Sequence, residues 1–366
     1  MELTIHHQVL LAALVLGGLL GAIANKTNFC TMGAVSDVVN MGDWGRMRAW
    51  LLAAAVALLG VVALEAFQLA AIGNETFPSY RTANFSWLRH VLGGLLFGIG
   101  MTLASGCGNK TLVRIGGGNL KSLVVLVIAA ACAYQMQWTN FFGDVFGPLV
   151  RATTINLAAS GHASQALGEL LGVGNTIAGI VVGLAVIAFV FAAKDFRENR
   201  DNVLAGIAIG LIVVAGWYVT GGKMGAEWKE WADFADVKPL RVETQSFTFM
   251  SPMGDGARYL MDPQNFSLIN FGIAAMVGVI VGSLLWALAS RSFRIEWFAS
   301  RGDFANHAIG AVLMGIGGPL AMGCTVGQAI TGVSTLALGS LLTFAAIVAG
   351  AAATMKVQYW WMMREA

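Results

Sequence analysis

The sequence has very little charge. Of its 366 residues only 11% are charged, whereas 57% are hydrophobic and the mean hydropathy is +0.70. Soluble domains carry about 25% charged residues, so a soluble protein of this size would lack the polar residues to cover its surface. Lipid is the solvent that suits this composition. The sequence therefore predicts an all-α polytopic membrane protein without a soluble domain.

Other absences narrow the function. The net charge is only +2 and the basic residues form no concentrated patch, which argues against nucleic acid as a partner. No Lys or Arg precedes the first apolar run, so that run is expected to be a retained span rather than a signal peptide. The four cysteines form no CxxC pair, which argues against a zinc site or a thioredoxin-like centre. We expect no metal and no cofactor.

Nucleotide-driven transport by this chain is not expected either. The segment GCGNKT has Asn109 before Lys110, where a phosphate-binding loop needs glycine.

Long apolar runs are what the sequence has in quantity. Crossing a bilayer takes about 20 apolar residues, and nine runs come close to that length. Three Gly-containing stretches within 24–49, 107–121 and 321–339 are too short to span, and we expect them to be re-entrant half-helices. The nine predicted spans are about 8–24, 49–72, 90–107, 121–139, 173–193, 202–220, 268–290, 303–321 and 339–355.

The basic residues predict the orientation. With the N-terminus outside, the short inner segments carry most of the 22 Lys and Arg residues. The positive-inside rule then favours an outer N-terminus and a cytoplasmic C-terminus. The outer segments 140–172 and 221–267 are long, and the second is polar enough to be exposed. Within it Trp228, Trp231 and Phe234 are spaced as one face of a helix lying on the membrane surface.

One segment is repeated. Residues 98–107 read GIGMTLASGC and residues 315–324 read GIGGPLAMGC, with seven of ten positions identical. In the predicted topology the two copies enter the membrane from opposite sides, as in transporters built from inverted repeats. The alternative is that the repeat is a helix-packing motif with no binding site. The repeat divides a single membrane domain, 1–366, into half A at about 1–139, a linking span at 173–193 and half B at about 202–366.

Each copy ends in Gly-Cys followed by a break. The half-helix interpretation puts Cys107 and Cys324 at or near helix N-termini, where free N–H groups attract anions. An unpaired anion in hydrocarbon costs on the order of tens of kcal/mol, so a path must supply donors throughout. A thiol is a weak donor with a polarizable sulfur, which suits a sulfur-containing anion. The alternative is that these cysteines are small buried hydrophobes.

Further residues are candidates with open alternatives. Cys30, in NKTNFCTMGAVSD (25–37), has no repeat partner that can be aligned, so it belongs either to the path or to the packing. Cys132, in mid-span, is expected to pack only. Glu65, inside the second span, is either functional or hydrogen-bonded within the bundle. The candidates that support the cysteines are Gly106, Gly108, Lys110, Gly323, Thr325 and Gln328.

The segments NFCTMGAVSD, GCGNKTLVRIGGGNLKSLVV and GCTVGQAITG resemble the three signature segments of the YeeE/YedE family of sulfur transporters. The resemblance covers nearly the whole chain. It implies an hourglass of inverted repeats with half-helices meeting at a constriction, and Cys30, Cys107 and Cys324 as the functional cysteines. It also implies thiosulfate uptake across the inner membrane and a small sulfurtransferase-like partner on the inner side. Ala329 departs from the family pattern, which has Gly there.

Three functions compete at this point. The first is a thiosulfate importer, not an enzyme, in which S–H hydrogen bonds pass the anion from cysteine to cysteine. Related importers are linked to other sulfur or selenium species. The second is a membrane thiol–disulfide electron carrier, which the absence of CxxC disfavours. The third is a structural subunit whose Gly-Cys motifs only pack. Proton-coupled, sodium-coupled and passive transport are all compatible with the sequence.

Overall fold

A computed structural model describes residues 4–365, and it is a bundle of helices. Nine described helices have 17 residues or more, and each coincides with one predicted span. They are α1 (Ile5–Lys26), α3 (Gly45–Ala66), α4 (Trp87–Leu103), α6 (Leu120–Trp138), α9 (Asn175–Ala192), α11 (Arg200–Gly221), α14 (Phe271–Ala289), α15 (Arg301–Leu320) and α16 (Leu338–Glu365).

The hydropathy of these helices confirms an all-α polytopic membrane protein. Eight helical segments of the described chain are long and apolar enough to cross a membrane. The remaining predicted span, 303–321, is a helix of 20 residues in α15. It does not reach the same apolarity because its first turns are polar and its last turns are rich in glycine.

Short helices occupy the three stretches predicted to be half-helices. Each begins directly after a cysteine, and the residues of its first turn are mostly buried. The interpretation as broken, inserted segments is therefore supported by both position and burial. These elements are α2 (Thr31–Ser36) with η1 (Asp37–Met41), α5 (Gly108–Gly116), and η5 (Gly327–Gly332) with η6 (Val333–Thr335).

The remaining elements lie in connections. Strand β1 pairs with β4 in parallel, and β2 pairs with β3 antiparallel. The elements are β1 (Thr76–Phe77), β2 (Asn84–Ser86), η2 (Phe142–Phe146), α7 (Gly147–Ala152), β3 (Thr154–Asn156), η3 (Leu157–Ser160), α8 (Leu167–Leu170), α10 (Lys194–Glu198), α12 (Lys223–Asp233), β4 (Thr244–Gln245), α13 (Met250–Met261) and η4 (Phe266–Leu268).

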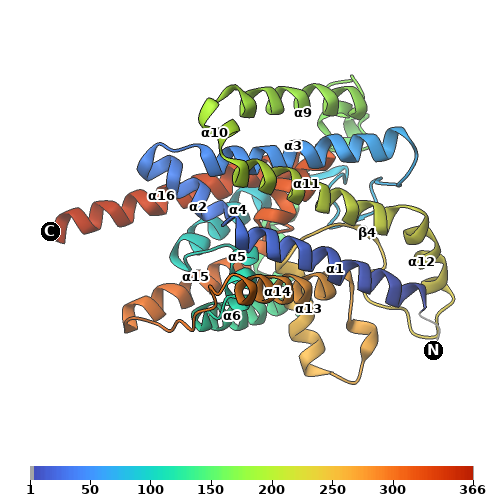
Figure 1. The fold of residues 1–366 in the computed structure, drawn as a ribbon. Helices are drawn as coiled ribbons and strands as arrows, with labels where there is room; N and C mark the ends of the chain where they lie inside the picture. Colours follow the sequence, from blue (N-terminus) through green and yellow to red (C-terminus); the bar gives the residue numbers. More distant parts are fainter. Residues whose placement is uncertain (1–3, 366) are drawn as a thin grey trace.

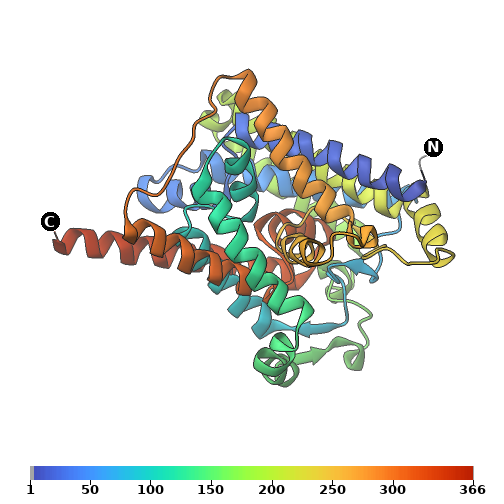
Figure 2. The same ribbon diagram turned by 90° about the horizontal axis from the view of Figure 1, so that it is seen from below.

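Helices α1, α3, α9 and α11 run side by side along one direction (Figure 1). Helix α3 packs between α9 and α11, and α1 packs against α11 and α14. On the other side of the bundle α4 packs against both α15 and α16. Helix α1 begins at one end of the bundle and α16 finishes at the opposite end (Figures 1 and 2). An odd number of crossings places the two ends of a chain in this way.

The two copies of the repeated segment run in opposite directions. A Cβ added at Gly93 of α4 would lie 2.5 Å from the backbone nitrogen of Ala321, and one at Gly100 would lie 2.7 Å from the Gly310 carbonyl oxygen. Residue numbers rising along α4 thus meet falling numbers along α15. Such close antiparallel packing needs small residues at the interface. The motif-bearing helices have the relative direction that an inverted repeat requires.

The outer segment 221–267 differs from its prediction as a membrane-surface helix. Trp228 is fully buried, and its indole N–H donates to His6 Nδ1 at 3.0 Å. Trp231 stacks on the same imidazole. Only Phe234, which is 85% exposed, faces outward. The predicted common apolar face was wrong because the two tryptophans pack against the start of α1 instead of lipid.

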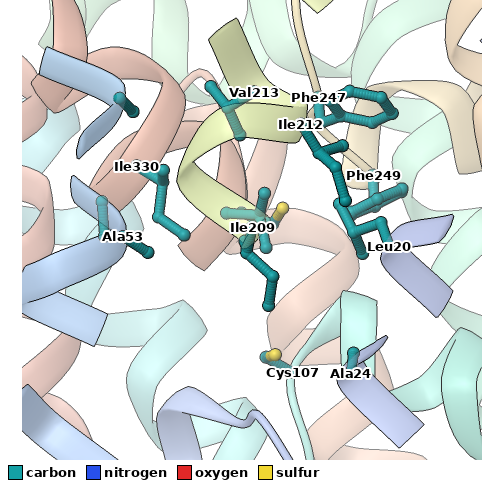
Figure 3. Packing of buried hydrophobic residues seen from close by; sticks show 14 of the residues in the cluster. Leu20, Ala24, Ala53, Cys107, Ile209, Ile212, Val213, Phe247, Phe249 and Ile330 are labelled. Carbon is teal, nitrogen blue, oxygen red and sulfur yellow. The ribbon is translucent and has the colours of Figure 1, made fainter. Parts of the chain in front are cut away.

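The middle of this segment is buried rather than exposed. The residues from Thr244 to Asp255 run into the bundle. Thr220 and Gln245 exchange two hydrogen bonds, and the Ser246 hydroxyl donates to the Val213 carbonyl at 2.8 Å. Figure 3 shows two phenylalanines of this segment, together with a candidate cysteine, in one buried cluster: Phe247, Phe249 and Cys107 with Leu20, Ala24, Ala53, Ile209, Ile212, Val213 and Ile330.

Candidate functional site

The three candidate cysteines share one backbone turn. The residue two positions before each, Asn28, Ser105 or Met322, has a left-handed φ of 52°, 56° or 62°. A long helix ends there with a hydrogen bond spanning five residues, which is a Schellman-type ending. Few non-glycine residues adopt this conformation. The same ending occurs at Gln68 after α3 and at Arg291 after α14, so what sets the three turns apart is the cysteine that follows two residues later. The bonds are Phe29 N–H to Ala24 O at 3.1 Å, Gly106 N–H to Met101 O at 2.8 Å, and Gly323 N–H to Gly318 O at 2.9 Å.

Each cysteine then starts the next helical segment. Cys30 is the N-cap of α2 and Cys107 the N-cap of α5, and helix begins again directly after Cys324. The Cys30 sulfur accepts the N–H of Gly33 at 3.5 Å, and the Cys324 sulfur accepts the N–H of Gly327 at 3.5 Å. The predicted position at half-helix N-termini is confirmed. Free N–H groups at such termini favour anions.

The structure corrects the prediction that Cys30 has no repeat partner. Its turn matches the other two, and residues 30–33 read CTMG where residues 324–327 read CTVG. This third copy of the turn is hard to see in the sequence because Asn-Phe precedes Cys30, whereas Ser-Gly and Met-Gly precede the other two cysteines. The useful signal lay after the cysteine, because Thr and Gly there begin the following helix.

The three turns converge. The Cys107 thiol lies near both the Cys30 thiol and the hydroxyl of Thr325, which is the residue after Cys324. Cys30, Cys107 and Cys324 are 4%, 1% and 0% exposed, and all are free thiols. Cys132 lies apart from this group, within α6, where its Cβ packs against Gly315 of α15.

Buried polar atoms without a partner concentrate around these thiols. Hydrogen-bond partners within the described chain are lacking for Thr31 Oγ1, Asn109 Oδ1, Thr325 Oγ1 and Gln328 Oε1, on residues one to four places after a cysteine. Leaving such a group unsatisfied costs about 1–3 kcal/mol, so each occurrence calls for a reason. A polar ligand that passes between the turns supplies one.

The buried outer segment completes the wall of the site. A Cβ at Gly327 would lie 2.5 Å from the Thr248 hydroxyl oxygen, which itself lacks a partner among the described residues. Met250 lies between the two repeats. Its sulfur is 3.2 Å from a Cβ position at Gly108, and its Cγ is 2.6 Å from one at Gly318. Sequence reasoning missed both residues because their segment looks like an exposed polar loop.

Tyr80 was also missed. Its hydroxyl donates to the Gly327 carbonyl at 2.6 Å, and its ring packs edge-on against Trp217. Burial raises the pKa of Tyr80 well above its ordinary range, with the nearby Cys324 adding to the effect. The hydroxyl therefore stays protonated and holds the Cys324 turn in place.

Glu65 is joined to the site only indirectly. Its carboxylate forms an ion pair with Arg81 at the end of α3. Arg81 also donates to the Ile72 carbonyl at 2.6 Å and to the Thr335 carbonyl at 2.9 Å. No described hydrogen bond joins Glu65 to a cysteine, so its contacts favour the alternative of a bundle-stabilising pair.

The other supporting candidates surround the thiols. A Cβ at Gly106 would lie 3.2 Å from Lys110 Cγ, and one at Gly323 would lie 3.3 Å from Gln328 Cγ. The Gln328 amide donates to the Ala321 carbonyl at 2.7 Å. The Lys110 ammonium donates to Asn28 Oδ1 at 3.4 Å. The structure thus brings these predicted residues to the cysteine turns.

Two cavities of about 270 Å³ each flank the turns at opposite ends of α6. The Arg89 cavity, lined by Arg89, Gln137, Arg241, Ser251 and Met322 among others, borders the Cys324 turn. The Lys110 cavity borders the Cys30 and Cys107 turns, and its lining includes Asn28, Lys110, Arg114, Asn119, Arg294 and Glu296. Both contain positive charge, as an anion path requires.

The Arg89 cavity contains one cation without a counter-ion. Arg241 is paired with buried Asp255 at 2.6 Å. Arg89 donates only to the Leu320 and Pro319 carbonyls, at 2.8 and 3.3 Å, and no described carboxylate lies within ion-pair distance of it. Its charge remains available to an anion at the mouth of the Cys324 turn.

Comparison with known proteins identifies the family to which this site belongs. The model of the sulphur transport family matches residues 26–353. The chain belongs to the sulphur transport family. It is similar to the thiosulfate transporter TsuA of Escherichia coli K12, with 26% identity over 335 residues, 88% of this chain and 87% of the relative. It is also similar to TsuA of Spirochaeta thermophila, with 24% identity over 337 residues, 90% and 93% of the two chains.

Membership of the sulphur transport family makes the chain a transporter rather than an enzyme. The match spans all three cysteine turns, from the end of α1 to within α16. The expected resemblance to sulfur transporters is therefore confirmed.

Proposed function

We propose that this protein imports thiosulfate across the inner membrane through the three cysteine turns. The observation that carries the proposal is the convergence of Cys30, Cys107 and Cys324 at helix starts, among unpartnered polar groups and between two positive cavities. The similarity to two thiosulfate transporters supports this substrate.

Thiosulfate matches the chemistry of the turns. Its terminal sulfur is soft and accepts weak S–H donation. Its oxygens accept hydrogen bonds from the N–H groups at helix starts and from the hydroxyls of Thr31 and Thr325. Each turn offers the same kinds of donor, a thiol and the N–H groups of a helix start. The anion therefore passes from one turn to the next by exchanging hydrogen bonds, without covalent change. The unpartnered hydroxyls are satisfied in turn as it passes.

The contacts suggest the order of the steps. Met322 lines the Arg89 cavity and belongs to the Cys324 turn. Cys107 lies near both Thr325 and Cys30, and Lys110 and Arg114 lie within electrostatic range of Cys30. Import then runs from the Arg89 cavity past Cys324, Cys107 and Cys30 to the Lys110 cavity.

This direction depends on the proposed orientation, with the N-terminus outside and the C-terminus cytoplasmic. It also assumes that residues 1–139 and 202–366 act as inverted halves joined by the span 173–193. Reporter fusions at Met1 and Ala366 test the orientation. Both termini on one side would contradict it. A small sulfurtransferase-like protein that captures the anion would bind on the C-terminal side.

A second function has one observation in its favour. The Cys30 and Cys107 thiols lie near each other, as the cysteines of a thiol–disulfide electron carrier must. Mass spectrometry of thiols during turnover separates the two functions. We expect free thiols throughout, whereas a Cys30–Cys107 disulfide that forms and disappears with transport would favour the electron carrier.

Vesicle uptake tests the main proposal. The full chain reconstituted in liposomes should take up ³⁵S-thiosulfate, and excess unlabelled thiosulfate should compete more strongly than sulfate, which lacks the terminal sulfur. Equal competition by sulfate would refute the soft-sulfur mechanism. Stronger competition by a selenium or another sulfur anion would reassign the substrate.

A further inference from the structure

The Lys110 cavity, where the proposed path past the cysteines ends, is strongly positive. Lys110, Arg114 and Arg294 line it together with a single carboxylate, Glu296. Three cations and one carboxylate leave a net charge of +2. No carboxylate among the described residues lies within 4 Å of any of the three cations.

The contacts of these side chains leave most of their donors free. The Lys110 ammonium reaches only Asn28 Oδ1, at 3.4 Å, and one Arg114 nitrogen donates to the Ser105 carbonyl at 2.7 Å. Arg294 is held through its backbone N–H, which donates to the Gly117 carbonyl at 3.0 Å. Glu296 is engaged by the Asn119 amide at 2.5 Å. The carboxylate is thus occupied while the guanidinium groups keep free N–H donors.

We propose that the Lys110 cavity is a separate binding site for a small tetrahedral dianion, held by Lys110, Arg114 and Arg294. Guanidinium forks bind oxyanions with paired, charge-assisted hydrogen bonds, and a dianion neutralises the net charge of the cavity. The site recognises oxygens and charge, whereas the cysteine turns recognise the soft sulfur. The role of the Lys110 cavity, to receive thiosulfate released from Cys30, rests on the proposed function.

The different chemistry of the two sites makes them separable. Sulfate has the shape and charge of thiosulfate but lacks the terminal sulfur. It should therefore bind the Lys110 cavity without depending on the thiols. Sulfate binding tests the cavity even if thiosulfate import through the cysteines proves wrong.

The test is equilibrium binding of ³⁵S-sulfate to the full chain in phosphatidylcholine nanodiscs. Arg114→Gln with Arg294→Gln should weaken binding at least about tenfold, since a hydrogen bond to a charged group contributes roughly 1.5–3 kcal/mol. Arg294→Gln alone should weaken it measurably while leaving the Arg114 contact to Ser105 intact. Arg291→Gln, an exposed change in the same loop outside the cavity, is the matched control and should bind normally.

Cys107→Ala should also bind sulfate normally. If that variant imports thiosulfate at the native rate, the proposed function fails while the cavity still stands. The cavity proposal is overturned if both arginine changes leave sulfate binding intact, or if Arg291→Gln weakens it equally.

A phospholipid headgroup offers a similar oxyanion, so the binding is repeated in phosphatidylglycerol nanodiscs. We expect sulfate to bind there too. Loss of sulfate binding in these discs, with phospholipid retained by the native chain and released by the double variant in native mass spectrometry, would assign the cavity to lipid and overturn the proposal.

Discussion

Cys107 and Cys132 have the same side chain in the same half of the molecule but opposite surroundings. Cys132 sits within α6, half-buried, where the helix already uses the backbone N–H groups around it. Cys107 is buried at the start of α5, where N–H groups are free and another thiol lies alongside. The difference shows that the backbone around a thiol, more than the thiol itself, makes it a candidate for anion transfer.

Among the changes that test this difference, replacing a cysteine of one of the three turns should have the largest effect on uptake. Cys107→Ala and Cys324→Ala remove one S–H donor from the path and should lower thiosulfate uptake roughly tenfold or more, by the magnitude of a hydrogen bond to a charged group. Cys30→Ala should act in the same direction. Cys→Ser should be intermediate, since a hydroxyl donates but lacks a soft sulfur.

Uptake must be scored per folded protein in the membrane, because deleting a buried thiol costs about 1 kcal/mol or more. Native rates for both Cys107→Ala and Cys324→Ala would remove the cysteines from the path.

Removing an unpartnered hydroxyl should have a smaller and unusual effect. Thr31→Val and Thr325→Val should slow uptake several-fold, yet thermal stability should be unchanged or higher, because a buried polar group without a partner is itself costly. Thr343→Val is the control, since that hydroxyl is bonded to His90 at 2.8 Å. Its loss should lower stability by about 1–3 kcal/mol. A stability loss in Thr325→Val like that of Thr343→Val would mean that Thr325 is an ordinary structural residue.

Glu65→Gln should affect folding more than transport. It leaves Arg81, only 6% exposed, without its counter-charge. We expect a loss of about 1–3 kcal/mol in stability, measured by thermal unfolding, with uptake per folded protein near the native rate. Slow uptake with native stability would instead give Glu65 a role in coupling.

Cys132→Ala should have the smallest effect. The change removes a half-buried thiol away from the turns and should cost no more than about 1 kcal/mol, with native uptake. If Cys132→Ala transported as poorly as Cys107→Ala, packing would explain both, and the relay would lose its support.

The spans and half-helices were predictable because the bilayer limits length and apolarity so strictly. The turn of Cys30 was missed because Asn-Phe before it differs from Ser-Gly and Met-Gly before the other two cysteines, although CTMG at residues 30–33 matches CTVG at residues 324–327. The placement of Thr248 and Met250 was hidden for another reason. Their segment alternates polar and apolar residues, and its partners, such as Gly108 and Gly327, are distant along the chain.

The buried segment from Thr244 to Asp255 also sets an order of assembly. Gln245 and Ser246 bond to α11, which is synthesised earlier, whereas Thr248 and Met250 rest on Gly327 and Gly318, which are synthesised later. During synthesis this stretch has only part of its final surroundings until α15 and the turn after it have entered the membrane. In a chain that stops after α14, Thr248 and Met250 would lack these contacts, so the wall beside the cysteine turns is complete only when α15 and the turn after it are in place.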